Sequence, residues 1–118
     1  MKTIVIYKFK TGYTKQYAQW IAEELSADIL PADKVSFQKL AEYDCIIFGG
    51  RLYAVGIDGL SLIKKNFEKL RGKRLIVFAV GASPVSETTQ STIRDANLSA
   101  QQQSAIKLFY FRGGFDYA

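Results

Sequence analysis

Histidine is absent from this chain, and cysteine, methionine and tryptophan each occur only once among its 118 residues. Without histidine, no Ser-His-Asp triad and none of the usual histidine-containing zinc sites can form. The single cysteine, Cys45, has no partner for an internal disulfide, and its position inside an apolar run predicts a buried, unreactive thiol. Much of the chemistry that enzymes perform with side chains alone is therefore excluded.

Long apolar runs are missing as well. The basic start MKTIVIYKFK contains an apolar stretch at residues 4–7, which is far too short for the core of a signal peptide. No later run approaches the length of a membrane span. We therefore expect a cytoplasmic protein with no membrane span.

Acidic residues are in the minority. The chain has 11 Asp and Glu against 16 Lys and Arg, which gives a net charge of +5. This balance suits anionic ligands or acidic partners. The basic residues are scattered and form no long block, so the charge does not indicate a nucleic-acid partner.

The chain does have the length of one ordinary domain and a hydrophobic fraction of 48%, which is typical of globular proteins. We therefore expect a single domain over residues 1–118. Along the chain, short continuous apolar runs typical of buried strands alternate with segments in which apolar residues have the spacing of a helix face. The apolar runs predict five strands, at residues 3–7, 27–31, 44–50, 74–81 and 107–114.

Helical segments separate the predicted strands. The first helix begins near Thr14, and the second is a brief turn at residues 36–43. The third has Asp58 as its predicted N-cap and ends at Gly72.

The fourth helix is predicted to have Ser83 as its N-cap, Pro84 as its first residue and an end near Ala96. Only a small turn is expected at residues 99–106. Strands that alternate with helices in this way predict a doubly wound, five-stranded parallel α/β sheet. Ligands of such sheets bind beyond the carboxyl ends of the strands, so the informative loops are 9–15, 50–58 and 81–85.

The first of these loops carries residues that suit an anion. Gly12 allows close approach of the backbone, and the hydroxyls of Thr11 and Thr14 can donate hydrogen bonds. Lys10 and Lys15 add positive charge, and N–H groups at the helix start favour a phosphate. The alternative is structural: Gly12 turns the chain and Thr14 caps the helix. The local residues leave both interpretations open.

Other phosphate-binding α/β folds are excluded by their own motifs. The chain has neither G-x-G-x-x-G after its first strand nor G-x-x-x-x-G-K-[ST]. Lys8 and Lys10 stand where a phosphoacceptor receiver needs carboxylates for its metal.

Several segments resemble flavodoxins. IVIYKFKTGYTKQYAQWIAEEL is similar to their first strand and the [ST]-x-T-G-x-T loop that wraps the FMN phosphate, and YDCIIFGGRLYAVGI is similar to their third strand and first flavin-flanking loop. LRGKRLIVFAVGASP and the ending FYFRGGFDY look most like the flavodoxin-domain subgroup that includes protoporphyrinogen-oxidase-type proteins. The resemblance covers essentially the whole chain and implies the strand order 2-1-3-4-5.

The resemblance also implies noncovalent FMN and the residues that would contact it. In this family pattern the first loop binds the phosphate, Tyr53 can stack on the ring, and the Gly56 peptide turns toward flavin N5 on reduction. The implied cofactor-binding residues are Lys10, Thr11, Gly12, Tyr13, Thr14, Lys15, Arg51, Leu52, Tyr53, Ala54, Gly56, Gly81, Ala82 and Ser83. No catalytic side chain and no metal ligand are implied.

The implied function is electron transfer through FMN to a partner protein or a small-molecule acceptor. Two alternatives remain: a quinone-linked or porphyrinogen-oxidising flavoenzyme, and a domain that has lost FMN and acts as an interaction module. Phe9 favours the last alternative because the family usually has Ser or Thr there, and Tyr13 replaces a frequent Asn. Carrier flavodoxins are usually strongly acidic, so the basic charge predicts a different redox partner.

The chain stops after its fifth predicted strand, where the family continues into a last helix. We therefore expect a C-terminally truncated domain with one sheet face open, together with the aromatic residues Phe109, Tyr110 and Phe111. Such a face predicts either a fragment of a longer protein or a homo-oligomer.

Overall fold

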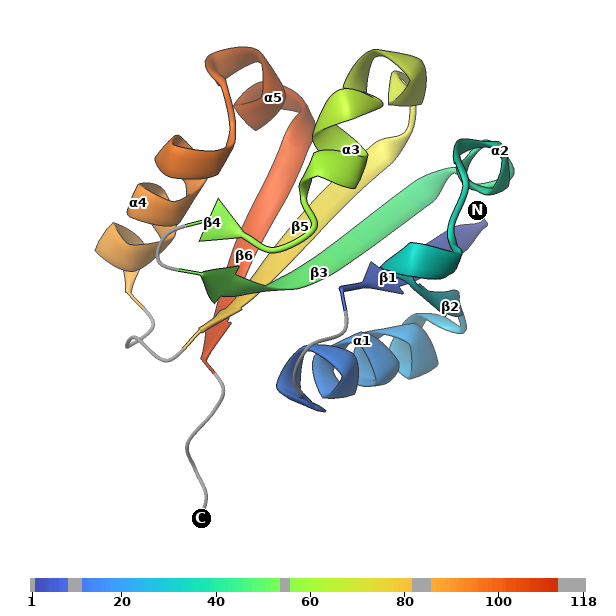
Figure 1. Cartoon of the computed structure of the whole chain (residues 1–118), viewed down its shortest axis with the longest axis horizontal. Coiled ribbons are helices and arrows are strands. Elements are labelled where there is room, and N and C mark those ends of the chain that lie inside the picture. Colours follow the sequence, from blue (N-terminus) through green and yellow to red (C-terminus); the bar gives the residue numbers. More distant parts are fainter. Residues whose placement is uncertain (1, 9–11, 54–55, 82–85, 113–118) are drawn as a thin grey trace.

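The fold is built on one sheet of six strands (Figure 1). The computed structural model describes residues 2–8, 12–53, 56–81 and 86–112. The strands are β1 (Thr3–Tyr7), β2 (Asp28–Pro31), β3 (Cys45–Tyr53), β4 (Gly56–Ile57), β5 (Arg74–Gly81) and β6 (Ile106–Arg112). Five of them are parallel in the order β2-β1-β3-β5-β6, and β4 pairs only with β3, in antiparallel fashion. With β4 set aside, this is the predicted order 2-1-3-4-5, and the predicted α/β class is confirmed.

Helices cover the two faces of the sheet unequally. They are α1 (Gly12–Leu25), the 3-10 turn η1 (Ala32–Lys34), α2 (Phe37–Leu40), α3 (Ser61–Lys65), the 3-10 turn η2 (Phe67–Leu70), α4 (Glu87–Asn97) and α5 (Ala100–Ala105). Within the described ranges, α1 packs on one face, and α2, α3, η2 and α4 contribute buried residues to the other. None of the helices described combines the length and apolar character needed to cross a bilayer.

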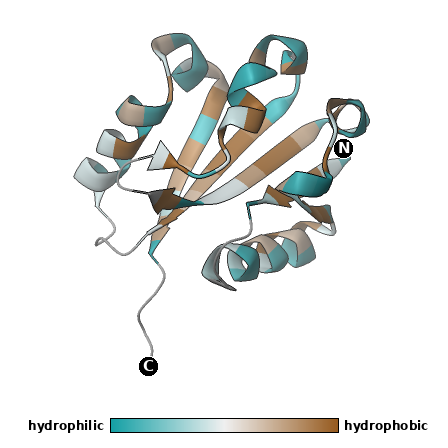
Figure 2. Cartoon of the chain, viewed as in Figure 1, coloured by the Kyte–Doolittle hydropathy of each residue, from teal (hydrophilic) through white to brown (hydrophobic). Residues whose placement is uncertain are grey.

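Side-chain alternation along the strands divides the core in two. On β1, Ile4 and Ile6 face the α3–α4 side, whereas Val5 and Tyr7 face α1. Because helices lie on both faces, both sets of residues are apolar, and the strands read as continuous hydrophobic runs. Figure 2 shows this concentration of hydrophobic residues along the strands.

The predicted third helix is wrong in two respects. It is broken into α3 and η2, and Leu60, not Asp58, occupies its N-cap position. Asn66 explains the break, because its side-chain amide donates to the Leu62 carbonyl at 2.8 Å and competes with continued helix. The predicted end is confirmed, since Gly72 adopts a φ of +87°.

The start of the fourth helix is also corrected. Ser83 and Pro84 lie outside the described residues, but α4 begins at Glu87, and Ser86 is its N-cap, with its hydroxyl accepting from the Thr89 N–H. The small turn expected after it is a complete short helix, α5. A capping box between Ser99 and Gln102 starts α5.

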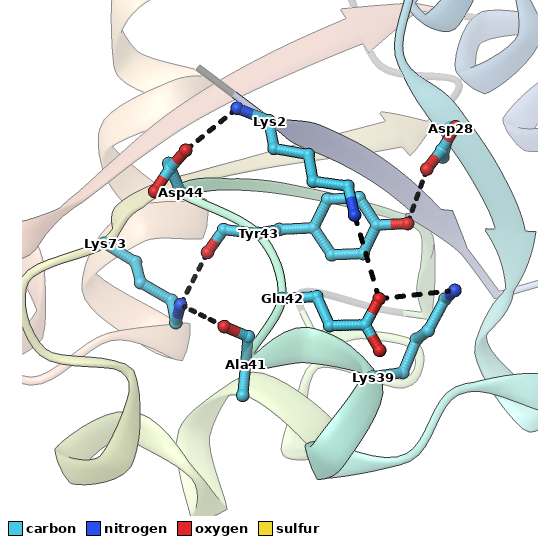
Figure 3. A network of polar contacts seen from close by, with 8 residues as sticks. All are labelled: Lys2, Asp28, Lys39, Ala41, Glu42, Tyr43, Asp44 and Lys73. Carbon is cyan, nitrogen blue, oxygen red and sulfur yellow. Dashed lines mark hydrogen bonds and ion pairs between the residues drawn. The ribbon is translucent and has the colours of Figure 1, made fainter.

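A polar network closes the amino edge of the sheet (Figure 3). The buried Tyr43 donates its phenolic hydrogen bond to Asp28 Oδ2 at 2.5 Å. Lys73 Nζ donates to the Tyr43 and Ala41 carbonyls, and Lys2 N donates to Asp44. These contacts tie β2 and the turn after η2 to the segment that enters β3.

The α1 face is open near β6. Phe109 is 43% exposed there, whereas Tyr17 of α1 stacks on Phe111 with ring centroids 4.8 Å apart. Tyr110, expected on the same open face, instead points to the covered side and is buried, because neighbouring strand residues alternate. Trp20 of α1 touches Tyr17 edge-on and is 53% exposed.

Candidate functional site

The carboxyl ends of the central strands lie side by side at one edge of the sheet. Tyr7 pairs with Gly49, and Arg51 pairs with Val80, so the ends of β1, β3 and β5 are in register. The Lys8 N–H continues the ladder to the Gly49 carbonyl at 2.9 Å. The three loops singled out from the sequence therefore leave the sheet at the same edge, as parallel topology requires. Five of the expected site residues, Lys10, Thr11, Ala54, Ala82 and Ser83, lie outside the described part of the chain.

Helix α1 begins at this edge with Gly12, two residues before Thr14. Thr14 is therefore inside the first turn, and the structural alternative in which Thr14 caps the helix is wrong. Its side chain is completely buried, and its Oγ1 has no hydrogen-bond partner among the described residues. A buried, unpaired hydroxyl costs about 1–3 kcal/mol. The hydroxyl lies where the N–H groups and dipole of a 14-residue helix favour an anion.

The neighbours of Thr14 differ in their surroundings. Tyr13 is 44% exposed. Lys15 lines a cavity of about 410 Å³ at the carboxyl ends of β1 and β2, together with Tyr7, Lys8, Pro31, Ala32, Asp33 and Lys34. Three lysines against one aspartate make this cavity positive. Sequence reasoning missed Lys34 because only the pairing of β2 with β1 brings residue 34 near residues 8 and 15.

The loop after β3 is a hairpin, which the sequence did not reveal. Leu52 pairs with Ile57 and Tyr53 with Gly56, and the Asp58 N–H donates to the Arg51 carbonyl at 3.0 Å. Arg51 and Leu52 are half-buried at its base. A two-residue strand gives too short a pattern to be recognised in a sequence.

Two glycines let the chain pass closely at this edge. A Cβ on Gly50 would lie 2.3 Å from the Asp58 carbonyl oxygen, so the return of the hairpin requires glycine there. A Cβ on Gly81 would lie 2.9 Å from Leu52 Cδ1 and 3.0 Å from the Tyr110 hydroxyl oxygen. The ends of β3, β5 and β6 therefore form a tightly packed floor, to which sequence analysis had not assigned Tyr110.

Ionisable groups elsewhere do not belong to this site. Cys45 is buried at the amino end of β3, as expected, and burial raises the pKa of its thiol. A bond to Thr3 and the charge of Arg74 lower the pKa by less. No cluster of three or more potential Asp, Glu or Cys metal ligands occurs within the described ranges.

This arrangement fits a phosphate-bearing ligand such as FMN. The buried Thr14 hydroxyl and the helix start suit its phosphate. The β3–β4 hairpin and the end of β5 lie at the same edge of the sheet.

Comparison with known proteins agrees with this geometry. The family model described as "Flavodoxin domain" matches residues 4–118. An uncharacterised protein of Methanocaldococcus jannaschii is 43% identical over 54 residues, which are 45% of this chain and 36% of that protein. The match thus spans about a third of that relative's length.

Solved structures share the architecture. The Trp repressor binding protein from Bacillus subtilis matches with a TM-score of 0.68 and 18% identity, over 98% of this chain and 85% of that one. The two-electron reduced flavodoxin of Megasphaera elsdenii matches with a TM-score of 0.62 and 14% identity, over 93% of this chain and 84% of that one. At these identities, the likeness establishes the fold.

Proposed function

The chain belongs to the flavodoxin-domain family, and from this premise we propose that it binds FMN noncovalently at the carboxyl edge of its sheet and takes part in electron transfer. One observation carries the proposal. Thr14 Oγ1 is buried in the first turn of α1, with no hydrogen-bond partner among the described residues. A phosphate oxygen would satisfy it.

The phosphate would be held by the segment from Lys10 to Lys15. Backbone N–H groups at the start of α1 donate to phosphate oxygens, and the hydroxyls of Thr11 and Thr14 add two donors. Gly12 carries no side chain to obstruct close approach. The charges of Lys10 and Lys15 complete an anion site that is also favoured by the helix dipole.

The flavin ring would lie between two loops. In this proposal residues 51–54 would line one side, with Tyr53 available to stack on the ring, and Gly81, Ala82 and Ser83 would line the other. The Gly56 peptide is the group that would turn toward the ring on reduction. Arg51 places a positive charge at the base of the hairpin, which favours a reduced, anionic flavin.

Bound FMN would supply the redox chemistry, passing electrons one or two at a time. The chain's own residues bind and orient it, exclude water from its ring and set its potential through contacts and charge. No side chain is required as a general acid or base. We propose as electron donor or acceptor either a small molecule or a protein with an acidic docking face, because the chain carries a net charge of +5.

Titration of the purified protein with FMN, followed by flavin fluorescence and absorption, tests the proposal. Thr14→Val keeps the shape of the side chain and removes the hydroxyl. We expect wild-type protein to quench FMN fluorescence at micromolar concentrations and Thr14→Val to bind about 10- to 100-fold more weakly, the value of a hydrogen bond to a charged group. Thr92→Val, at an exposed site on α4, is the matched control and should bind normally.

In the FMN-free protein we expect Thr14→Val to have no destabilising effect, in contrast to its effect on FMN affinity. Removing an unpaired buried hydroxyl should leave the free energy of unfolding unchanged or raise it by about 1 kcal/mol. Urea denaturation without FMN measures this. Marked destabilisation of Thr14→Val would mean that the hydroxyl serves the fold, and absence of FMN binding by folded wild-type protein would leave the interaction-module alternative.

A further inference from the structure

Asn97, the last residue of α4, is one of only two buried polar or charged side chains in the described part of the chain, the other being Thr14. Both ends of its amide are bonded. Nδ2 donates to the Ile93 carbonyl on its own helix at 2.8 Å, and Oδ1 accepts from the Ile57 N–H of β4 at 3.0 Å. Reversing the amide would set a donor against that N–H, so the two bonds fix its orientation.

The Asn97 side chain accepts a hydrogen bond from the Ile57 N–H, as the backbone of a second neighbouring strand would do. β4 is two residues long and pairs with β3 on one side, where Asp58 N–H donates to the Arg51 carbonyl. The Ile57 N–H, one residue earlier, points to the other side, where Asn97 accepts it. A two-residue strand has little stability of its own, so this buried side-chain bond is a large part of what holds β4 in place. Figure 1 shows β4 lying between β3 and α4.

The Ile57 N–H and the Gly56 carbonyl belong to one peptide group. Rotation of that peptide therefore breaks the bond to Asn97 Oδ1. Because Ile57 is buried, the released N–H would find no water to replace the lost acceptor.

We propose that Asn97 is a positioning residue for the flavin site: it holds the Gly56–Ile57 peptide in the orientation seen here and thereby sets the difference in affinity between oxidised and reduced FMN. This inference rests on the proposed FMN-binding function. By holding the peptide, Asn97 disfavours the turn that would accompany reduction, and so it keeps the potential of bound FMN low.

Asn97→Leu tests the proposal, because leucine has a similar size and no acceptor. Ile93→Val is the matched control: it removes one methylene from a buried residue of the same helix, which costs about 0.5–1.5 kcal/mol, and leaves the Asn97 bond intact. We expect Asn97→Leu to speed hydrogen exchange of the Ile57 amide well beyond the change in Ile93→Val, with or without FMN.

With FMN bound, Asn97→Leu should strengthen the affinity for reduced relative to oxidised FMN by about three- to tenfold, where tenfold corresponds to about 30 mV in a two-electron potential. Ile93→Val should leave this ratio unchanged. If wild-type protein binds FMN and Asn97→Leu has the same potential, or a lower one, the inference is wrong while the proposed function stands. If wild-type protein does not bind FMN, the proposed function fails. If hydrogen exchange of the Ile57 amide is the same in Asn97→Leu as in wild type, Asn97 does not anchor the Gly56–Ile57 peptide.

Discussion

At the scale of single residues, two buried hydroxyl groups, those of Thr14 and Tyr43, differ in whether they are hydrogen-bonded. Thr14 is buried with an unpaired hydroxyl among the described residues, an arrangement that costs stability unless a ligand satisfies it. Tyr43 is buried with its hydroxyl bonded to Asp28, at the opposite edge of the sheet. The first pattern is the one that the proposed phosphate site requires, and the second links β2 to the segment before β3.

The raised pKa of Tyr43 predicts how the stability of the protein changes at alkaline pH. Its hydrogen bond to Asp28, followed by burial and the nearby charges of Asp28 and Glu42, raises its pKa from 10.0 to about 12. Above pH 10 the unfolded chain releases this proton while the folded chain keeps it, so the contribution of Tyr43 to stability is fully present below pH 10 and is lost as the pH rises from 10 to about 12.

Tyr43→Phe removes both the bond and this titration. We expect the variant to be about 1 kcal/mol less stable than wild type at neutral pH, and the difference to shrink above pH 10. Urea denaturation from pH 7 upward measures the free energy of unfolding at each pH. Tyr13→Phe, at an exposed tyrosine, is the control. A stability difference that stays the same at all pH values would contradict the assignment.

At the scale of elements, the β3–β4 hairpin borders the candidate site. The sequence pattern did not predict it. It depends on close approach of two backbones, since Gly50 lies against the Asp58 carbonyl, and on the Asn97 bond from α4. Neither contact leaves a periodic signal, because the first is a single backbone approach within the hairpin and the second joins residues 40 positions apart.

Gly50→Ala should disturb this hairpin. Its Cβ would lie 2.3 Å from a backbone oxygen that cannot move without shifting the hairpin. We expect a loss of about 1–3 kcal/mol in the free energy of unfolding, as for other overpacked sites, and weaker FMN binding.

Gly72→Ala is the contrasting variant. Gly72 has a φ of +87° and open space around its Cβ position, so alanine there costs about 1–2 kcal/mol of backbone strain far from the hairpin. It should lower stability without weakening FMN binding, as measured by urea denaturation and flavin fluorescence. Equal losses of FMN affinity in both variants would show that general destabilisation, and not the hairpin, is responsible.

At the scale of the whole molecule, the two sheet faces are covered to different extents. Four helical segments contribute to the core on one face, while within the described residues α1 alone packs on the other and leaves Phe109 of the edge strand β6 exposed. Tyr17 of α1 covers the end of β6 on this face: its ring stacks on Phe111, and its hydroxyl donates to the Arg112 carbonyl at 2.7 Å. Among the described residues, Phe109 therefore lies exposed on an edge strand that pairs on one side only.

Phe109→Lys should reduce this exposed apolar surface while leaving the core intact, because lysine is well tolerated on edge strands. We expect the variant to bind less of a hydrophobic dye than wild type, and any self-association through this face to weaken in sedimentation experiments. Leu25→Lys removes another exposed apolar side chain, 54% exposed against 43% for Phe109, at the end of α1 and is the control. If both variants lower dye binding alike, the dye does not report on the β6 face.

Most of the fold was determined locally by the sequence. The residues of β1 and β5 agree with the apolar runs that predicted them, and the crossover connections then require parallel order, because a βαβ unit returns to the sheet in one hand only. The same reasoning predicted that the loops after the parallel strands meet at one edge of the sheet, which the strand register confirms, and the phosphate site around Gly12 and Thr14 stays a prediction. Local signals sufficed for the strands and their order because strand period and helix period are properties of neighbouring residues.

The β3–β4 hairpin was decided by tertiary structure. β4 is held on one side by the Asn97 bond to the Ile57 N–H and on the other by its pairing with β3. The break between α3 and η2 at Asn66 and the start of α4 at Ser86 rest instead on local side-chain bonds, to Leu62 and Thr89, which the apolar periodicity does not reveal. The complete burial of the Thr14 side chain is likewise a property of the folded chain that its residue type does not predict. The bond between Asn97 and Ile57 joins residues that lie far apart in sequence, and such a contact exists only once folding has brought β4 and α4 together.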